Sequence, residues 1–364
     1  MSFRRRRYMM IGIFSTILVV IIAGSMLVIH TVVLTYGSSN TESSSATAPA
    51  STLASVKQVA GHKVPVATAS QVPVLVYHEM DNDCAASAPI CQSHDYESVS
   101  TSQFTAEMAW MYDQGYHTVT MSQYLAWLAN KQYKLPTKPF FITVDNGIGD
   151  FLEGAQPILY HYRFTAVAFL VTGFADGANG KCGPKISGVN VQPECPKGDI
   201  GWDLTWPQLK ALSPSVYSFS IEAGQDGHYQ QDYDKNCFAF NACKLPGESD
   251  AAYTIRVKSE MSDGIAELTS ELGSRFNGDA WVVPYSDLGY TCPKTCTAYE
   301  SYDGPSGWLV SYAATTFHAA FVQDPTRNGI RNERFRYEIH ALDTLSDFKS
   351  AINGYLLSQS WAWR

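Results

Sequence analysis

From residue 72 onward, short hydrophobic runs alternate with longer amphipathic segments. Nearly continuous apolar runs predict strands that are covered on both faces, and they lie at 72–77, 140–144, 165–171, 216–221 and 281–285. The amphipathic segments predict helices at 104–114, 124–130, 154–162, 253–272 and 345–357, with another opening at Thr205-Trp206-Pro207, because proline suits a first helical turn. Strands that alternate with helices predict an α/β fold with a parallel sheet, either open or closed into a β/α barrel.

The N-terminus has a different pattern. Four arginines, Arg4 to Arg7, precede a stretch at 8–34 that contains no Asp, Glu, Lys or Arg. A bilayer core needs roughly 20 apolar residues in a helix, and arginines mark its cytoplasmic side. We therefore expect residues 1–36 to form a single-pass signal-anchor in the cell membrane, with the C-terminal domain extracytoplasmic. A cleaved signal peptide is the alternative, because Ala46-Thr47-Ala48 has the small-residue pattern of a cleavage site.

The segment after the anchor changes in composition. Residues 37–70 are rich in Ser, Thr and Ala and poor in large apolar side chains, so we expect a flexible stalk before a domain at 71–364. The formal net charge is -8, and it is -12 once the four N-terminal arginines are set aside. Because nucleic-acid phosphates need Lys and Arg, this acidic chain is not expected to bind nucleic acid, and its membrane contact should be the N-terminal helix alone.

The chain's eight cysteines lie in four close pairs. These are Cys84 and Cys91, Cys182 and Cys195, Cys237 and Cys243, and Cys292 and Cys296. An even number beyond an export signal predicts disulfides. Each pair follows a predicted strand, so in a parallel fold the four loops should emerge at one face, where active sites form. Aromatic residues of these loops, Trp202, Tyr229 and Trp308 among them, could stack on sugar rings or simply cap long loops.

One acidic residue ends a predicted strand. Asp145 follows the apolar run at 140–144 and precedes Asn146 and Gly147. A carboxylate at the carboxyl end of a buried strand is well placed to act as a general base or a metal ligand. Asp-Asn-Gly is also a favourable turn sequence, so a purely structural role is the alternative.

Several motifs, in order, resemble the polysaccharide deacetylase (NodB-homology) family of carbohydrate esterases. They are Pro-Val-Leu-Val-Tyr-His at 73–78, Phe-Phe-Ile-Thr-Val-Asp-Asn-Gly at 140–147, the segment 157–169, Thr-Trp-Pro-Gln-Leu at 205–209, Pro284-Tyr285 and the segment 336–340. The resemblance spans roughly 72–357. It implies a distorted, incomplete parallel β/α barrel that removes acetyl groups from N- or O-acetylated sugars.

The resemblance also implies a metal centre, from which this sequence departs. In the family a divalent metal such as zinc is held by one Asp and two His, and a second Asp is the base. Asp145 matches the base, while Asn146 stands at the ligand Asp. Alignment on the second ligand His gives His228, with Gly224 at the first. Glycine has no side chain that could bind a metal.

Nearby residues could rebuild or complete the site. Glu222 and Asp226 lie close to His228 in sequence, and with Asp145 they could form a carboxylate and histidine metal site. His340, at the end of the closing strand, is a candidate general acid. The candidates for binding the substrate are His78, Pro284, Tyr285, Trp202, Tyr229 and Trp308.

Two functions follow from the resemblance. The first is a membrane-anchored, extracytoplasmic protein that hydrolyses acetyl groups of a cell-envelope or extracellular polysaccharide, such as peptidoglycan, with a divalent metal as cofactor. The second is a catalytically inactive relative that binds a glycan in the inherited groove, for which no cofactor is needed. The sequence holds no Walker-type phosphate loop, dinucleotide fingerprint or Gly-x-Ser-x-Gly elbow that would point to another enzyme class.

Overall fold

The computed structural model describes a set of ranges that lie within one compact unit, 48–364. They are 52–61, 64–80, 97–178, 191–192, 204–225, 230–231, 248–286, 308–322, 333–335, 337–339 and 343–358. Outside them lie the predicted anchor, all eight cysteines, and the candidates Trp202, Asp226, His228, Tyr229 and His340. Within these ranges, no helix has the length and apolar character needed to span a bilayer.

Nine of the described strands form one large parallel sheet, in the order β14-β13-β12-β10-β8-β7-β2-β15, with β5 beside β7. The strands are β2 (Val74–Tyr77), β5 (His117–Thr118), β7 (Pro139–Val144), β8 (Ala166–Val171), β10 (Tyr217–Ala223), β12 (Phe276–Val282), β13 (Ala319–Val322), β14 (Glu333–Phe335) and β15 (Tyr337–Glu338). From β2 to β14 they follow sequence order, and β15 then returns to pair with β2. No ladder joins β14 to β15 among these strands, so the sheet is a curled, incomplete barrel, which confirms the predicted α/β class.

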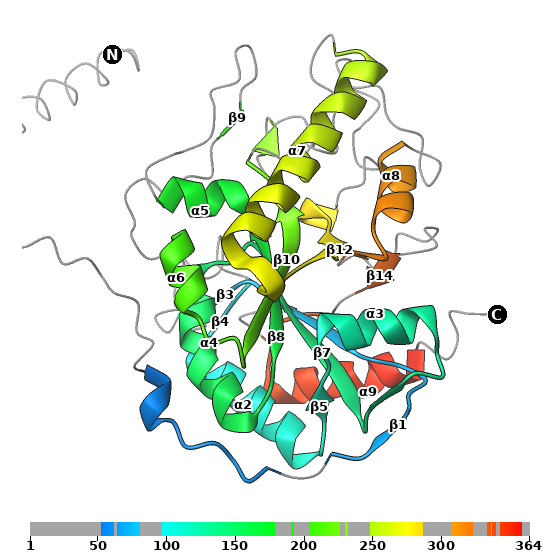
Figure 1. Ribbon diagram of the computed structural model, residues 1–364. Coiled ribbons are helices and arrows are strands. Elements are labelled where there is room, and N and C mark those ends of the chain that lie inside the picture. Colours follow the sequence, from blue (N-terminus) through cyan, green and yellow to red (C-terminus); the bar gives the residue numbers. More distant parts are fainter. Residues whose placement is uncertain are drawn as a thin grey trace, which may run out of the picture. The chain divides into compact units, whose positions relative to one another are not determined.

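Helices surround the sheet (Figure 1). They are α2 (Thr101–Asp113), α3 (Met121–Ala129), α4 (Gly149–Tyr162), α5 (Thr172–Ala178), α6 (Trp206–Ala211), α7 (Asp250–Leu272), α8 (Trp308–Thr316) and α9 (Leu345–Ser358). Side-chain caps fix several starting points. Ser100 accepts from the backbone N–H of Gln103, and Thr120 forms a reciprocal capping box with Gln123.

The two faces of the sheet have separate cores, because successive strand residues point to opposite sides. One face packs on the helical layer through residues such as Leu75, Ile142 and Ile221. The other face, which carries Phe141, Phe169 and Phe321 among others, packs on α3, where the Tyr124 ring stacks on Phe141 with centroids 4.9 Å apart. By the same alternation, His78, Asp145 and Glu222 lie on the face that carries Phe141, at the carboxyl ends of their strands.

Part of the segment predicted to be a stalk, 37–70, lies against the domain. Residues Val66–Thr68 (β1) pair antiparallel with Lys134–Pro136 (β6). Further upstream, after the 3-10 helix η1 (Thr52–Ser55), the Arg163 side chain donates to the carbonyl oxygen of Val59 at 2.9 Å. These contacts tie 52–61 and 64–68 to the side of the domain on which the strands begin, as the blue segment in Figure 1 shows.

The predicted strand at 281–285 is displaced in the structure. β12 runs from Phe276 to Val282, and Pro284 and Tyr285 lie in the 3-10 turn η5 (Pro284–Ser286). Proline has no N–H to donate to a ladder, so the strand ends before it. After Phe276, the residues Asn277, Gly278 and Asp279 interrupt the hydrophobic signal of β12, which is why the pattern placed this strand too late.

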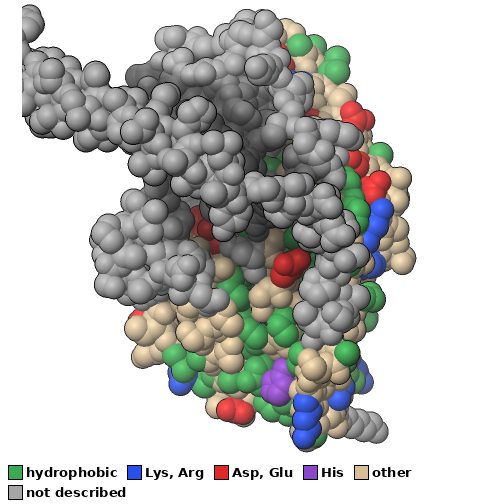
Figure 2. Space-filling view, turned by 90° about the vertical axis from the view of Figure 1, so that its left-hand side faces the viewer, with side chains coloured by type: hydrophobic (Ala, Val, Ile, Leu, Met, Phe, Trp, Pro, Cys, Tyr) green, Lys and Arg blue, Asp and Glu red, His purple; other side chains and the backbone are tan. Residues whose placement is uncertain are grey.

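The surface of the domain is mixed in charge. In Figure 2, which faces the side that lies to the left in Figure 1, Asp and Glu and Lys and Arg side chains are scattered among hydrophobic and uncharged ones. Exposed large hydrophobic side chains are scattered too, and among the described residues they are Val64, Val66, Tyr133 and Ile255. Single exposed apolar residues of this kind are normal for a folded domain.

Candidate functional site

The centre of the site is the tight turn after β7. Asp145 is buried, with 2% of its surface exposed, and its backbone N–H donates to the carbonyl oxygen of Tyr77 at 3.0 Å. Asn146 and Gly147 follow with φ of 62° and 79°, in the left-handed region that Asn and Gly tolerate best. A Cβ on Gly147 would lie 2.3 Å from Leu170 Cδ2. The Asp-Asn-Gly sequence is therefore needed for the turn, and the turn holds Asp145 at the end of the barrel.

His78 lies beside Asp145 because of the register between their strands. Tyr77 of β2 is the partner of Val144 of β7, so the next residue on each strand meets the other. The distance from His78 Nε2 to Asp145 Oδ2 is 3.7 Å, and only 7% and 3% of the two side chains are exposed. A buried imidazole next to a buried carboxylate can exchange or share a proton with it.

A second carboxylate, Glu97, approaches the same imidazole. Its Oε2 lies 3.9 Å from His78 Nε2, and 48% of the Glu97 side chain is exposed. The placement follows from the short parallel pairing of β3 (Glu79–Met80) with β4 (Ser98–Val99), in which Glu79 is opposite Ser98. The Ser98 hydroxyl also donates to Glu79 Oε2 at 2.9 Å. Sequence reasoning missed Glu97, since nothing in its neighbourhood marks it and only the pairing of the two strands brings it to His78.

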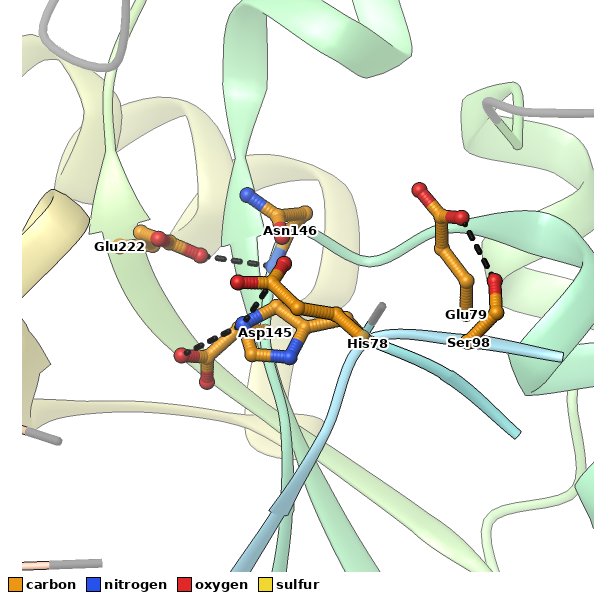
Figure 3. Close-up of polar contacts among 7 residues, drawn as sticks. His78, Glu79, Ser98, Asp145, Asn146 and Glu222 are labelled. Carbon is orange, nitrogen blue, oxygen red and sulfur yellow. Dashed lines mark hydrogen bonds and ion pairs between the residues drawn. The ribbon is translucent and has the colours of Figure 1, made fainter. Parts of the chain in front are cut away.

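Glu222 holds the Asp145 turn from the other side (Figure 3). This buried side chain extends from β10, and its Oε2 accepts from the backbone N–H of Asn146 at 2.7 Å. The carbonyl oxygen of Glu222 accepts from Trp281 Nε1 at 2.8 Å. A carboxylate that accepts a backbone N–H is a strong, charge-assisted contact. The structure therefore uses Glu222, a predicted metal ligand, to fix the turn that carries Asp145.

The described residues do not fit the metal centre that the family resemblance implies. Asn146 offers a neutral amide in place of a carboxylate, and Gly224 offers no side chain at all. Helix α7 also packs directly on Gly224, because a Cβ there would lie 2.5 Å from the carbonyl oxygen of Glu260. In the part of the chain that the structure describes, no group of three or more His, Cys, Asp or Glu is placed to hold a metal ion.

Two of the predicted substrate-binding aromatics pack against the core. Trp308, the first residue of α8, lies with its ring centroid 5.5 Å from that of Tyr253 and 5.2 Å from that of Tyr312. Tyr285 is half-buried, has φ of 53°, and packs on the core cluster of the helical layer together with Trp308. The structure therefore gives both rings a packing partner, while the candidate His78 lies 3.7 Å from Asp145.

A buried acid lies behind the site. Glu107 of α2 is fully buried, and the hydroxyl of Tyr77, the residue before His78, donates to its Oε2 at 2.8 Å. Burial raises the pKa of Glu107 from 4.5 to about 7, although hydrogen bonds from Tyr77 and Gln103 oppose the shift and the charge of Asp343 adds to it. This carboxyl connects α2 to the strand that ends at the site.

Comparison with known proteins supports the resemblance. No protein-family model matches the chain. A protein of Bacillus subtilis (strain 168) named "Putative polysaccharide deacetylase YxkH" is 30% identical over 103 residues, which cover 28% of this chain and 32% of that protein. The match thus spans about a third of the length of this relative.

Two solved structures share the fold. The de-N-acetylase of Aggregatibacter actinomycetemcomitans superposes with a TM-score of 0.54 at 19% identity, over 77% of this chain and 98% of that one. The Streptococcus pyogenes deacetylase PplD, solved with acetate, gives a TM-score of 0.50 at 18% identity, over 77% and 96%. The chain thus has the fold of these two deacetylases, and the resemblance to polysaccharide deacetylases seen in the sequence is confirmed.

Proposed function

We propose that this protein acts on N- or O-acetylated polysaccharide at the carboxyl end of its curled sheet. The observation that carries the proposal is the buried pair of Asp145 and His78, with 3.7 Å between Oδ2 and Nε2, at the end of the barrel where parallel folds build their sites. The solved structures of the same fold, a de-N-acetylase and a deacetylase, support the choice of acetyl groups as the target.

The pair has the groups that acetyl hydrolysis needs for proton transfer. A water molecule attacks the carbonyl carbon of the acetyl group, and the Asp145 carboxylate accepts the proton that this water gives up. The new carbon–oxygen bond forms as the bond to the sugar nitrogen or oxygen breaks. In this proposal His78, which lies 3.7 Å from Asp145, gives a proton to the leaving atom from its protonated form, so that acetate and the free amine or hydroxyl are the products.

Binding without hydrolysis is a second function that specific residues favour. Asn146 and Gly224 stand at two of the three ligand positions that the family resemblance gives to the metal, so the group that would polarise the acetyl carbonyl lacks its support. A buried carboxylate and imidazole still offer a hydrogen-bond acceptor and donor to an acetamido group. In this case the domain retains acetylated polymer and releases no acetate.

We also propose that the protein works at the cell surface. The support is the sequence alone: the arginines before the apolar stretch at 8–34, and the four cysteine pairs. Labelling of intact cells with a membrane-impermeant reagent would show whether the C-terminal domain lies outside. Labelling only after the cells are broken would contradict this proposal.

Acetate release and polymer retention test the two functions together. The full-length protein in detergent is incubated with peptidoglycan, chitin and an O-acetylated polysaccharide, and the same polymers after chemical deacetylation are the control. Release of acetate that Asp145→Asn abolishes supports hydrolysis. Retention on the acetylated polymers only, with no acetate, supports binding. Equal retention on acetylated and deacetylated polymers, without acetate release, would contradict both.

A further inference from the structure

Three glycines bring the end of β10 against two helices. We call Gly173 of α5, Gly224 after β10 and Gly264 of α7 the glycine cluster. A Cβ on Gly264 would lie 2.8 Å from Gly224 Cα, and one on Gly173 would lie 2.3 Å from the carbonyl oxygen of Gln225. Real Cβ atoms do not approach other atoms so closely. Each of these positions therefore needs glycine, because backbone meets backbone there.

Hydrogen bonds hold the same segment in place. The backbone N–H of Gly173 donates to the carbonyl oxygen of Gly224 at 3.2 Å. The Gln225 side chain donates to Glu267 Oε2 of α7, also at 3.2 Å. The end of β10 is thus fixed between α5 and α7. A histidine at 224 would have to displace α7, because its Cβ alone would lie 2.5 Å from the carbonyl oxygen of Glu260.

Asn146 is the other described position at which this chain departs from the family pattern, and it takes part in a different contact. The backbone N–H of Asn146 donates to the Glu222 carboxylate at 2.7 Å, so this acid is already engaged by a protein donor. A cation at this turn would meet a neutral amide and would compete with that N–H for Glu222. Both described positions that differ from the family pattern therefore have a structural use.

We infer that the position of the first metal-binding histidine has become a packing contact of the glycine cluster, and that the site acts without a divalent metal. The inference rests on the proposed function for its substrate, since it states how that same site works. It gives the cluster a defined role, which is to fix β10 so that Glu222 reaches the Asp145 turn. The metal requirement that the family resemblance implies would then not extend to this chain.

Metal content of the full-length protein tests the inference directly. The protein is incubated with zinc, cobalt or nickel, passed through gel filtration, and measured by elemental mass spectrometry beside Asp145→Ala and His228→Ala. We expect far less than one metal per chain, with the same value in both variants. About one metal per chain that either substitution removes would overturn the inference. This measurement does not depend on the substrate, so it stands even if the proposed function fails.

A chelator provides the second test. Acetate release, or retention on acetylated polymer, should be the same in EDTA as in buffer with added zinc. A loss in EDTA that zinc restores would overturn the inference and leave the proposed function intact. No action on any acetylated polymer in either buffer would instead count against the proposed function alone.

Two substitutions distinguish Gly224, where packing leaves no room for a side chain, from Asn146, where only a metal-binding carboxylate is missing. Asn146→Asp restores a carboxylate without touching the glycine cluster and should still bind well below one zinc per chain. Gly224→His should unfold at a lower denaturant concentration than Gly354→His, because a Cβ at Gly354 in α9 would meet nothing within 4 Å. Stoichiometric zinc in Asn146→Asp, or wild-type stability with bound zinc in Gly224→His, would contradict the inference.

Discussion

His78 and Asp145 meet across two adjacent parallel strands, with 3.7 Å between Nε2 and Oδ2, because Tyr77 and Val144 are register partners. Each residue directly follows the last residue of its strand, and its side chain is almost fully buried. The proton chemistry of the site therefore depends on the alignment of β2 with β7.

The His78–Asp145 contact predicts a large effect on activity for a change at His78 and a small effect for a change at Glu97, the second carboxylate beside the ring. His78→Gln should lower acetate release by about 100-fold, the usual contribution of a positioned proton donor. Glu97→Gln should lower it by at most about fivefold, because a half-exposed ion pair is worth only roughly 0–1 kcal/mol. Steady-state rates on an acetylated polymer give both values, with circular dichroism as the folding control. Equal losses in the two variants would contradict this prediction, because they would show that the exposed Glu97 matters as much as the His78 ring itself.

Removal of Glu222 should loosen the turn that holds Asp145. Glu222→Ala leaves the buried N–H of Asn146 without its acceptor and should cost about 1–3 kcal/mol of unfolding free energy. Glu222→Gln keeps a side-chain oxygen and should cost less. Urea denaturation of the two variants checks the difference. If Glu222→Gln were as damaging as Glu222→Ala, the negative charge rather than the hydrogen bond would be what the turn needs.

Two helical glycines should respond in opposite directions to alanine. Gly354→Ala should stabilise the protein by roughly 0.5–1 kcal/mol, because alanine is the better helix former and the added methyl meets open space. Gly264→Ala has the same helix benefit but forces a methyl against Gly224, and should destabilise by about 1–3 kcal/mol. Thermal unfolding of both variants measures the difference. Stabilisation by Gly264→Ala would mean that α7 does not press on β10.

Glu107 makes stability depend on pH. Its pKa rises from 4.5 to about 7 in the folded protein, so between these values the folded state binds more protons than the unfolded state. Unfolding free energy should therefore fall as pH rises from 4.5 to about 7, by up to about 3 kcal/mol, and then level off.

Glu107→Gln isolates this effect from other titrating groups. The amide keeps an oxygen for the Tyr77 hydroxyl but carries no proton to lose, so the variant should gain stability relative to the wild type as pH rises. The quantity to measure is the difference between the two urea unfolding free energies at pH 5 and pH 7.5. A difference that stays constant with pH would place the pKa of Glu107 outside this range.

Much of the fold follows from local sequence pattern. The apolar runs before His78 and Asp145 placed β2 and β7 to within two residues, since a strand covered on both faces must be apolar throughout. Capping residues such as Ser100 and Thr120 fixed helix starts for the same local reason. The hydrophobic pattern missed a strand start that contains polar residues, in β12, and it missed the short buried strand β13.

The sequence by itself determined that Asp145 ends a buried strand in a tight turn, because Asp-Asn-Gly and the apolar run before it are local signals. Only the tertiary structure decided what surrounds that carboxylate. Glu222 is 76 residues from Asn146, and Gly264 meets Gly224 only because α7 crosses the end of β10. Such contacts depend on strand order and helix packing, which no local pattern specifies. The sequence therefore located Asp145. The packing of the domain brought His78 and Glu222 next to it, and it left no room for a side chain at Gly224.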